Sequence, residues 1–238
     1  MLLNVFNCSP RGVGSNTKVL TDAFSEGFLQ ARHSSGEVNE VREFLVTDPE
    51  DCALGLEAFP MPSSALIAFP LYVDAMPAIA KAFIEDIYSY RGRCGSTRML
   101  FLVQSGFPEE THTRVMKDYL EKLAKRMGAP CDGVIRMGGG EAIRYKRRGS
   151  KPGKVWQRYQ ELGRIYGEKG LLDEGILKSL AGVRRVPLLA RLFAPRFVNK
   201  FLWDRELKRN GAYENRFDRP LEDVAQGPRL EGGSRPAG

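Results

Sequence analysis

The chain has 238 residues, of which 42% are hydrophobic, 10% aromatic and 27% charged. This balance is typical of a globular protein and excludes disorder for most of the chain. No apolar run approaches the roughly 18 to 20 residues of a membrane-spanning helix, and no basic leader with a cleavage site opens the chain. We therefore expect a cytoplasmic protein with one large domain, or with one domain and an extension.

The formal net charge of +7 is unevenly distributed. Residues 1–143 carry 14 Lys or Arg against 18 Asp or Glu, whereas residues 144–209 carry 18 against 6. Residues 210–238 carry 4 against 5. A uniformly basic domain would not show this division, so we expect a weakly acidic body followed by a basic extension.

The cysteine pattern argues against a metal site. Cys8, Cys52, Cys94 and Cys131 are widely separated, form no C-x-x-C motif and do not cluster with a histidine. Zinc and iron–sulfur sites require much closer spacing. We expect four reduced, mostly buried thiols and no bound metal.

The first predicted unit is a strand, a glycine-rich loop and a helix. Residues 2–7 form a short apolar run that ends in a polar loop with two glycines. From Asn16 onwards, apolar residues recur at helical spacing, and either Ser15 or Asn16 can cap the helix.

Strand and helix patterns then alternate along the chain. Pro70 is expected to close the third strand, and Glu109 and Glu110 to occupy the first turn of a helix that ends at Gly128. The later strands are expected at 38–46, 65–69, 99–103 and 133–137, and the later helices at 76–87, 109–127 and 155–167. This alternation predicts an α/β protein with a doubly wound, five-stranded parallel sheet in a three-layer α/β/α arrangement.

The loop at residues 9–17 has the composition of an anion site. Its backbone N–H groups precede a helix, where the helix dipole favours negative charge, and Arg11 adds a formal charge. It lacks the lysine of a Walker A motif, and Thr17 stands where a dinucleotide fingerprint has its third glycine. An ordinary glycine-rich turn is the alternative.

Two segments resemble one family. Asn7-Cys8-Ser9-Pro10-Arg11, followed by Ser15-Asn16-Thr17, resembles the phosphate loop of the flavodoxin-like NAD(P)H-dependent FMN reductases. Phe69 to Pro77, with its P-x-Y and M-P elements, resembles the same family's second loop. The resemblance covers residues 1–143 and is looser at 201–203 and 216–220.

The resemblance implies a flavodoxin-like fold with an FMN site. The FMN phosphate would be held by Ser9, Arg11, Ser15, Asn16 and Thr17. The isoalloxazine edge would be lined by Pro70, Leu71, Tyr72, Val73 and Met76. The pocket would be completed by Gln104, Ser105 and Gly106. Some relatives carry a compact cysteine motif for an iron–sulfur cluster, but this chain has only Cys52 there, so we expect a branch without the cluster.

The implied activity is hydride transfer from NADPH or NADH to bound FMN, and then to a small acceptor such as a flavin, quinone, nitro or azo compound, or metal oxyanion. No catalytic side chain is implied. His112 is interpreted either as a proton donor or as an exposed residue at a helix start. The alternatives are a flavodoxin-like electron carrier and a membrane-surface adaptor on an empty flavodoxin-like scaffold.

We expect the flavodoxin-like domain at residues 1–170, a basic amphipathic helical extension at 171–225 and a disordered tail at 226–238. Apolar and basic residues are interleaved between Ile176 and Trp203. The preferred interpretation is packing against the domain or a second subunit, as in a homodimer. Peripheral contact with an anionic membrane is the next alternative, and nucleic acid binding ranks last.

Overall fold

The structure is a computed structural model that describes residues 1–32, 36, 38–140, 143, 153–183, 187–188, 200 and 203–218. The chain divides into two compact units, Met1–Arg185 and Val186–Gly238. The first unit extends past the domain boundary expected at residue 170. Residues 184–186, 189–199, 201–202 and 219–225 of the predicted extension, and all of the predicted tail, lie outside the described residues.

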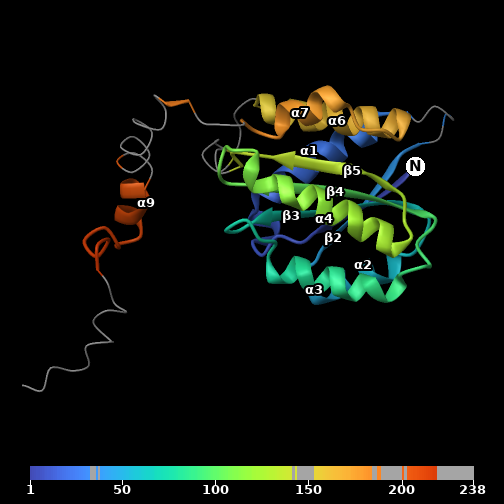
Figure 1. Cartoon of the computed structure of the whole chain (residues 1–238), viewed down its shortest axis with the longest axis horizontal. Coiled ribbons are helices and arrows are strands. Elements are labelled where there is room, and N and C mark those ends of the chain that lie inside the picture. The colour runs from blue at the N-terminus through green and yellow to red at the C-terminus, as the bar shows by residue number, and fades with distance from the viewer. Residues whose placement is uncertain are drawn as a thin grey trace, which may run out of the picture. The chain divides into compact units, whose positions relative to one another are not determined.

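Five parallel strands form one sheet in the order β2-β1-β3-β4-β5 (Figure 1). The strands are β1 (Leu2–Asn7), β2 (Glu40–Leu45), β3 (Ser63–Leu71), β4 (Thr97–Ser105) and β5 (Cys131–Met137). The strand order reverses between β1 and β3, which pair directly up to Asn7 and Ala68. This arrangement confirms the predicted doubly wound sheet and is the flavodoxin-like strand order.

The third strand is longer than the sequence pattern predicts. It continues through Pro70 to Leu71, and Pro70 pairs with Gln104 of β4. The prediction that Pro70 closes the strand was therefore wrong. Pairing with β1 ends at Ala68, so Pro70 lies where β3 has a free edge and a residue without an N–H group is tolerated.

Helices cover both faces of the sheet, as predicted. One face carries α1 (Asn16–Gln30), α6 (Lys154–Lys169) and α7 (Glu174–Leu180). The other carries α2 (Pro49–Ala58), α3 (Ala78–Ile87) and α4 (Thr111–Met127) (Figure 1). Successive β3 residues alternate between the two cores, with Leu66 and Ala68 in one and Ile67 and Phe69 in the other. We did not predict α2.

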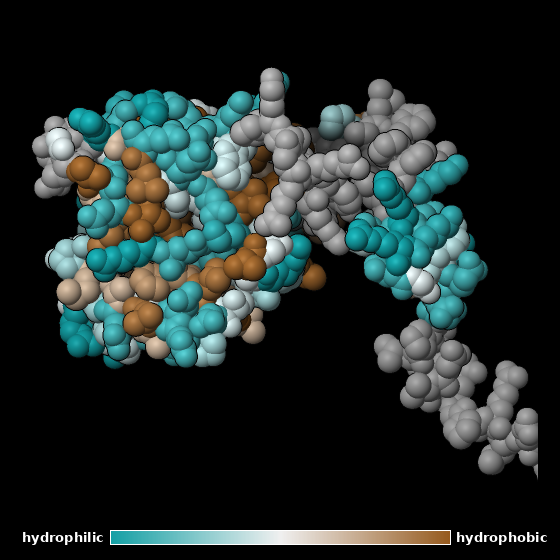
Figure 2. Space-filling model, turned by 180° about the vertical axis from the view of Figure 1, so that it is seen from behind, coloured by the Kyte–Doolittle hydropathy of each residue, from teal (hydrophilic) through white to brown (hydrophobic). Residues whose placement is uncertain are grey.

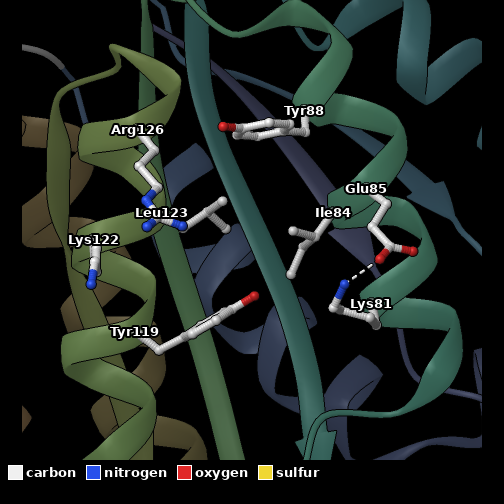
Figure 3. Close-up of a pocket in the computed structure, with 8 residues that line it drawn as sticks. All are labelled: Lys81, Ile84, Glu85, Tyr88, Tyr119, Lys122, Leu123 and Arg126. Carbon is white, nitrogen blue, oxygen red and sulfur yellow. Dashed lines mark hydrogen bonds and ion pairs between the residues drawn. The ribbon is translucent and has the colours of Figure 1, made fainter.

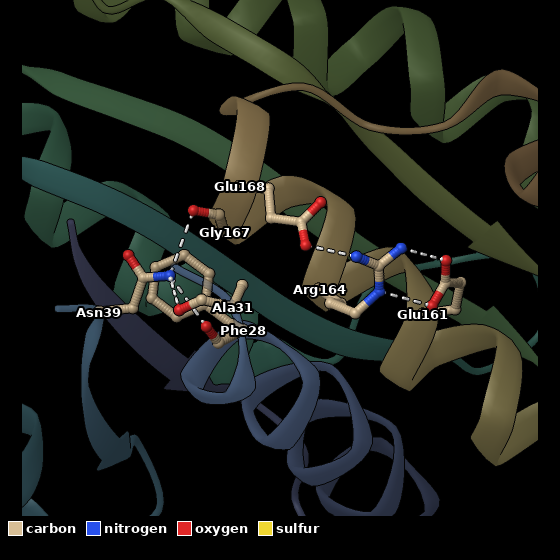
Figure 4. A network of polar contacts seen from close by, with 7 residues as sticks. All are labelled: Phe28, Ala31, Asn39, Glu161, Arg164, Gly167 and Glu168. Carbon is tan, nitrogen blue, oxygen red and sulfur yellow. Dashed lines mark hydrogen bonds and ion pairs between the residues drawn. The ribbon is translucent and has the colours of Figure 1, made fainter. Parts of the chain in front are cut away.

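The helices α1 and α6 are in backbone contact. A Cβ atom added to Gly27 would lie 1.8 Å from the Gln160 carbonyl oxygen, and one added to Gly163 would lie 1.9 Å from that of Phe24. Only glycine fits at such an approach. The Asn39 amide then ties both helices to the segment before β2, donating to the carbonyls of Phe28, Ala31 and Gly167 at 3.0 to 3.1 Å (Figure 4).

A second polar cluster lies at the amino ends of the strands. The Asp132 side chain is 2% exposed and accepts hydrogen bonds from both Arg98 and Tyr166. The Tyr166 hydroxyl also lies 2.9 Å from Ser64 Oγ. Burial, followed by the negative charge of Asp132, raises the pKa of Tyr166, so this phenol stays protonated and can donate.

The ends of α1 and α4 agree with the prediction from the sequence, except at the start of α4. Ser15 caps α1 by accepting a 3.0 Å hydrogen bond from the Lys18 N–H, and Gly128 ends α4 in the left-handed conformation. Glu109 and Glu110 precede α4 rather than lying in its first turn, which corrects the prediction. Glu110 instead pairs with Arg136 at 3.2 Å.

The thiols are free, as predicted, but not uniformly buried. Cys8 and Cys94 are buried, Cys52 is intermediate, and Cys131 is exposed at the start of an edge strand. Seen from behind in Figure 2, the first unit carries separate hydrophobic patches among hydrophilic areas. Within the described ranges, no helix has the length and apolarity to span a membrane.

The second unit is described through α9 (Asp204–Arg209) and the residues after it. Asp204 and Glu206 lie in the first turn of α9, and Lys208 and Arg209 lie in its last turn, an order that suits the helix dipole. Lys208 and Arg216 both contact the Tyr213 ring. The predicted membrane contact and homodimer stay predictions.

Candidate functional site

Three loops meet at the carboxyl ends of β1, β3 and β4. The first loop comprises residues 8–15, the second comprises residues 72–77, and the third comprises residues 106–110. In a doubly wound sheet, ligands bind outside these strand ends, at the point where the strand order reverses. The predicted FMN site residues all lie in these loops or in the elements beside them.

The first loop contains buried polar groups without partners. The side chains of Ser9 and Thr17 have no exposed surface, and neither hydroxyl has a hydrogen-bond partner; the same holds for the amide nitrogen of Asn7. An unpaired buried polar group is costly, and native proteins satisfy nearly all of them. Three such groups around one loop therefore fit a bound ligand with several hydrogen-bond acceptors.

Backbone groups add to this donor set. The N–H groups of Asn16 and Thr17 lie in the first turn of α1 and have no intrahelical acceptor. Together with the helix dipole, they favour an anion at this point. The residues present therefore fit the phosphate group of FMN. The sequence did not single out the Asn7 side chain, because Asn7 is the last residue of a strand.

The other three predicted phosphate residues are already engaged in the loop. The Ser15 hydroxyl accepts from Lys18, and the Asn16 amide donates to the Gly140 carbonyl at 2.9 Å. The exposed Arg11 donates to the Gly14 carbonyl at 3.0 Å. These contacts shape the loop, and direct phosphate contact by these side chains stays a prediction.

The second loop projects from the end of β3. Pro70 and Leu71 are buried, and Met76 packs against the core on the side of α3 and α4. Tyr72 is half exposed and Val73 is 95% exposed at the tip. Of the predicted ring-edge residues, Tyr72 and Val73 are thus the ones that present most side-chain surface to a ligand.

The third loop is braced by the glycine segment that follows β5. The Ser105 hydroxyl accepts from the Phe107 N–H at 3.3 Å, and the Ser105 carbonyl accepts from the Gly140 N–H at 2.8 Å. A Cβ atom on Gly140 would lie 1.9 Å from Gln104 Oε1. The lack of a side chain at Gly140 therefore leaves room for the buried Gln104 side chain, a role that we did not assign to this run of glycines. Gly106 is exposed.

Residues after α7 also brace the third loop. The Val183 N–H donates to the Pro108 carbonyl, and the Glu110 N–H donates to the Val183 carbonyl, each at 3.0 Å. Gly182, with φ +107°, approaches the Pro108 carbonyl so closely that a Cβ atom would lie 2.5 Å from it. This segment was predicted to belong to the extension, and local sequence carried no signal for its contact with the site.

The histidine near the site is more than an exposed residue at a helix start. His112 Nδ1 lies 2.6 Å from Asp74 Oδ1 in the second loop, and its ring stacks on Phe107 of the third loop. The contact joins two predicted walls of the pocket.

Two buried groups among the described residues of the first unit are not activated as nucleophiles. Burial raises the pKa of the Cys8 thiol, and burial likewise raises the pKa of the Tyr159 phenol. Both groups are therefore neutral at physiological pH. In the part of the chain that the structure describes, no three His, Cys, Asp or Glu side chains gather closely enough to hold a metal ion.

A groove of about 530 Å³ lies elsewhere, between α3 and α4 (Figure 3). Ile84 and Leu123 project into it from the two helices, with tyrosines and cations around them. Its lining residues are Lys81, Ile84, Glu85, Tyr88, Tyr119, Lys122, Leu123 and Arg126. None of the predicted FMN residues lines this groove.

Comparisons with known proteins agree with the fold. No family model and no curated protein matches the chain. Among solved structures, the chain is similar to an FMN-dependent NADH-azoreductase from Bacillus anthracis in complex with FMN. The identity is 13%, the TM-score is 0.50, and the match covers 71% of this chain and 100% of that one.

Two further structures are similar over nearly their whole length. An NADPH-quinone reductase from P. pentosaceus is 14% identical with a TM-score of 0.50, covering 70% of this chain and 98% of that one. An oxidoreductase from Corynebacterium diphtheriae is 16% identical with a TM-score of 0.50, covering 78% and 99%. At these identities the likeness shows the fold, which is flavodoxin-like.

Proposed function

We propose that this protein is an FMN-dependent NAD(P)H oxidoreductase. In this proposal, hydride passes from NADPH or NADH to bound FMN and then to a small acceptor. The observation that carries it is the pair of buried, unpartnered hydroxyls of Ser9 and Thr17 beside the helix start that follows β1. Their position at the reversal of strand order is where this fold takes its ligand.

The protein's own contribution would be binding and orientation. Ser9, Thr17 and the first-turn N–H groups of α1 would hold the phosphate, supported by Asn7. Tyr72, Val73 and the braced segment from Gln104 to Gly106 would flank the ring. FMN, when bound, would supply the hydride-accepting chemistry, so no protein nucleophile or acid–base pair is required.

We specify the electron acceptor only as a class of small molecules. The similar proteins include one described as an azoreductase and one described as a quinone reductase. Flavins, quinones, nitro and azo compounds and metal oxyanions all suit an open cleft above a reduced ring. Exposed Tyr72 and Phe107 favour planar acceptors, because aromatic faces stack.

Comparing FMN with riboflavin tests the phosphate contact directly. Hydrogen bonds to charged groups contribute about 1.5–3 kcal/mol each, so two of them predict that FMN binds at least about 100-fold more tightly than riboflavin. Titration calorimetry on flavin-free protein measures both affinities. Equal affinities would contradict the phosphate role of the first loop.

Anaerobic reduction then separates the functional alternatives. An oxidoreductase predicts bleaching of the bound-flavin absorbance by NADPH or NADH at a catalytically useful rate, with reoxidation by a small acceptor. Flavin binding without bleaching by either nucleotide would favour an electron carrier instead. Failure to bind FMN at all would leave only the adaptor alternative.

A further inference from the structure

The turn at the tip of the second loop has an unfavourable conformation. Val73 and Asp74 have φ values of 50° and 62°, and among the described residues they are the non-glycine residues with positive φ. Tyr72 and Ala75 exchange two backbone hydrogen bonds, of 2.9 and 3.1 Å, across them. This two-residue turn normally takes Asn-Gly, because a β-branched side chain is strained at positive φ.

Packing of the valine does not compensate for this strain. The Val73 side chain is 95% exposed, so it buries almost no apolar surface. Strained backbone of this kind persists where surrounding contacts hold it, and it is concentrated at functional sites. The contacts that hold this turn must therefore come from elsewhere in the molecule.

His112, the second residue of α4, provides such a contact. Its Nδ1 atom lies 2.6 Å from Asp74 Oδ1, across 38 positions of sequence. Its ring stacks on Phe107, with ring centroids 4.9 Å apart and planes at 29°. Its Nε2 atom lies 3.9 Å from Oε2 of Glu109, which precedes α4. The histidine is thus fixed on the third loop and reaches the strained turn of the second.

We propose that the Asp74–His112 contact is a strap that holds the strained Val73–Asp74 turn, which makes His112 a positioning residue for the flavin site. Tyr72 precedes the turn directly, and its backbone is fixed by the two hydrogen bonds to Ala75. The strap therefore sets the position of Tyr72 relative to the third loop. This last step rests on the proposed function; the strap itself is a property of the flavin-free protein.

Four proteins test the strap: the native chain, His112→Phe, Val73→Gly and the double variant. Phenylalanine keeps the ring on Phe107 and removes the contact with Asp74. Glycine removes the strain, because it adopts positive φ freely. Amide hydrogen exchange of residues 71–76 in flavin-free protein is the first measurement. We expect exchange about tenfold faster in His112→Phe, and within about twofold of native in the double variant.

Two results of this exchange experiment would overturn the strap. One is native protection of residues 71–76 in His112→Phe. The other is a double variant that is as unprotected as His112→Phe, since relief of strain should make the strap unnecessary. Asp74→Asn keeps an acceptor oxygen and a residue that tolerates positive φ, so it should retain nearly native exchange; fast exchange there would also count against the proposal.

FMN affinity tests the positioning role. We expect the dissociation constant to rise about five- to twentyfold in His112→Phe relative to the native chain. Because Val73 itself would flank the ring, the double variant is compared with Val73→Gly, and we expect their dissociation constants to agree within about twofold. Unchanged FMN affinity in a faster-exchanging His112→Phe would overturn the positioning role. If the native chain binds no FMN while the exchange pattern holds, the proposed function fails and the strap stands.

Discussion

Two sets of buried polar side chains, at opposite edges of the sheet, differ in how they are paired. At the amino ends of the strands, Asp132, Arg98, Tyr166 and Ser64 satisfy one another in one cluster. At the carboxyl ends, the hydroxyls of Ser9 and Thr17 are buried without partners, and the Val73 turn is strained. Since departures from local rules concentrate at functional sites, we expect the first edge to serve stability and the second to bind ligand.

Removing the centre of the amino-edge cluster should have the largest effect on stability. In Asp132→Ala, the buried Tyr166 hydroxyl and the half-exposed Arg98 lose a charged acceptor. We expect the free energy of unfolding to fall by about 2–3 kcal/mol, with FMN affinity unchanged. Denaturant titration and calorimetry measure the two quantities. A parallel loss of FMN affinity in the folded variant would contradict the separation of the edges.

A matched control removes an exposed ion pair. Lys117 lies 3.6 Å from Glu121, and both side chains are about half exposed. Lys117→Ala should change the free energy of unfolding by less than about 1 kcal/mol, because exposed pairs contribute little.

At the carboxyl edge we expect a substitution to weaken FMN binding without lowering the free energy of unfolding. In Thr17→Val, an unpartnered buried hydroxyl is replaced by a methyl group of similar shape. We expect unchanged or slightly greater stability, together with a loss of FMN affinity of about 10- to 100-fold. Chemical denaturation of the flavin-free protein and FMN titration are the measurements. Destabilisation without loss of affinity would assign Thr17 to the core instead of the site.

Thr21 provides the control on the same helix. It is equally buried, but its hydroxyl donates to the Lys18 carbonyl at 3.0 Å. Thr21→Val should therefore lose about 1 kcal/mol of stability and leave FMN affinity unchanged.

A smaller effect is expected where the glycine segment supports Gln104. In Gly140→Ala, the new methyl group must displace the Gln104 side chain, and we expect FMN affinity to fall about 3- to 10-fold at a stability cost of about 1 kcal/mol. A Cβ atom on Gly95, at the amino edge, would meet no atom within 4 Å. Gly95→Ala is thus the comparison variant, and an equal loss of affinity in both would refute the role of Gly140.

The fold was largely predictable because buried parallel strands give continuous apolar runs that stand out between helical patterns. The second helix was missed although Asp48 caps it and Pro49 occupies its first turn, because its apolar residues show only weak periodicity. The end of β3 was misplaced because the tolerance of Pro70 depends on where β1 stops pairing.

The site was predictable only in part. Short sequence motifs identified Ser9, Thr17 and Tyr72, because the residues of each loop lie close together in the sequence. The contacts of Gly140 with Gln104, and of Asp74 with His112, join positions 36 and 38 apart and have no local signature. The missing partners of Ser9 and Thr17 could be seen only once burial and hydrogen bonding were known.

The glycine contact between α1 and α6 bears on the order of assembly during synthesis. The first helix leaves the ribosome early, but Gly163, which lets α6 lie directly against it, is made more than a hundred residues later. Until then, the surface of α1 around Gly27 has no covering helix. Because such distant contacts are slow to close, we expect α1 to reach its final packing among the last events of folding.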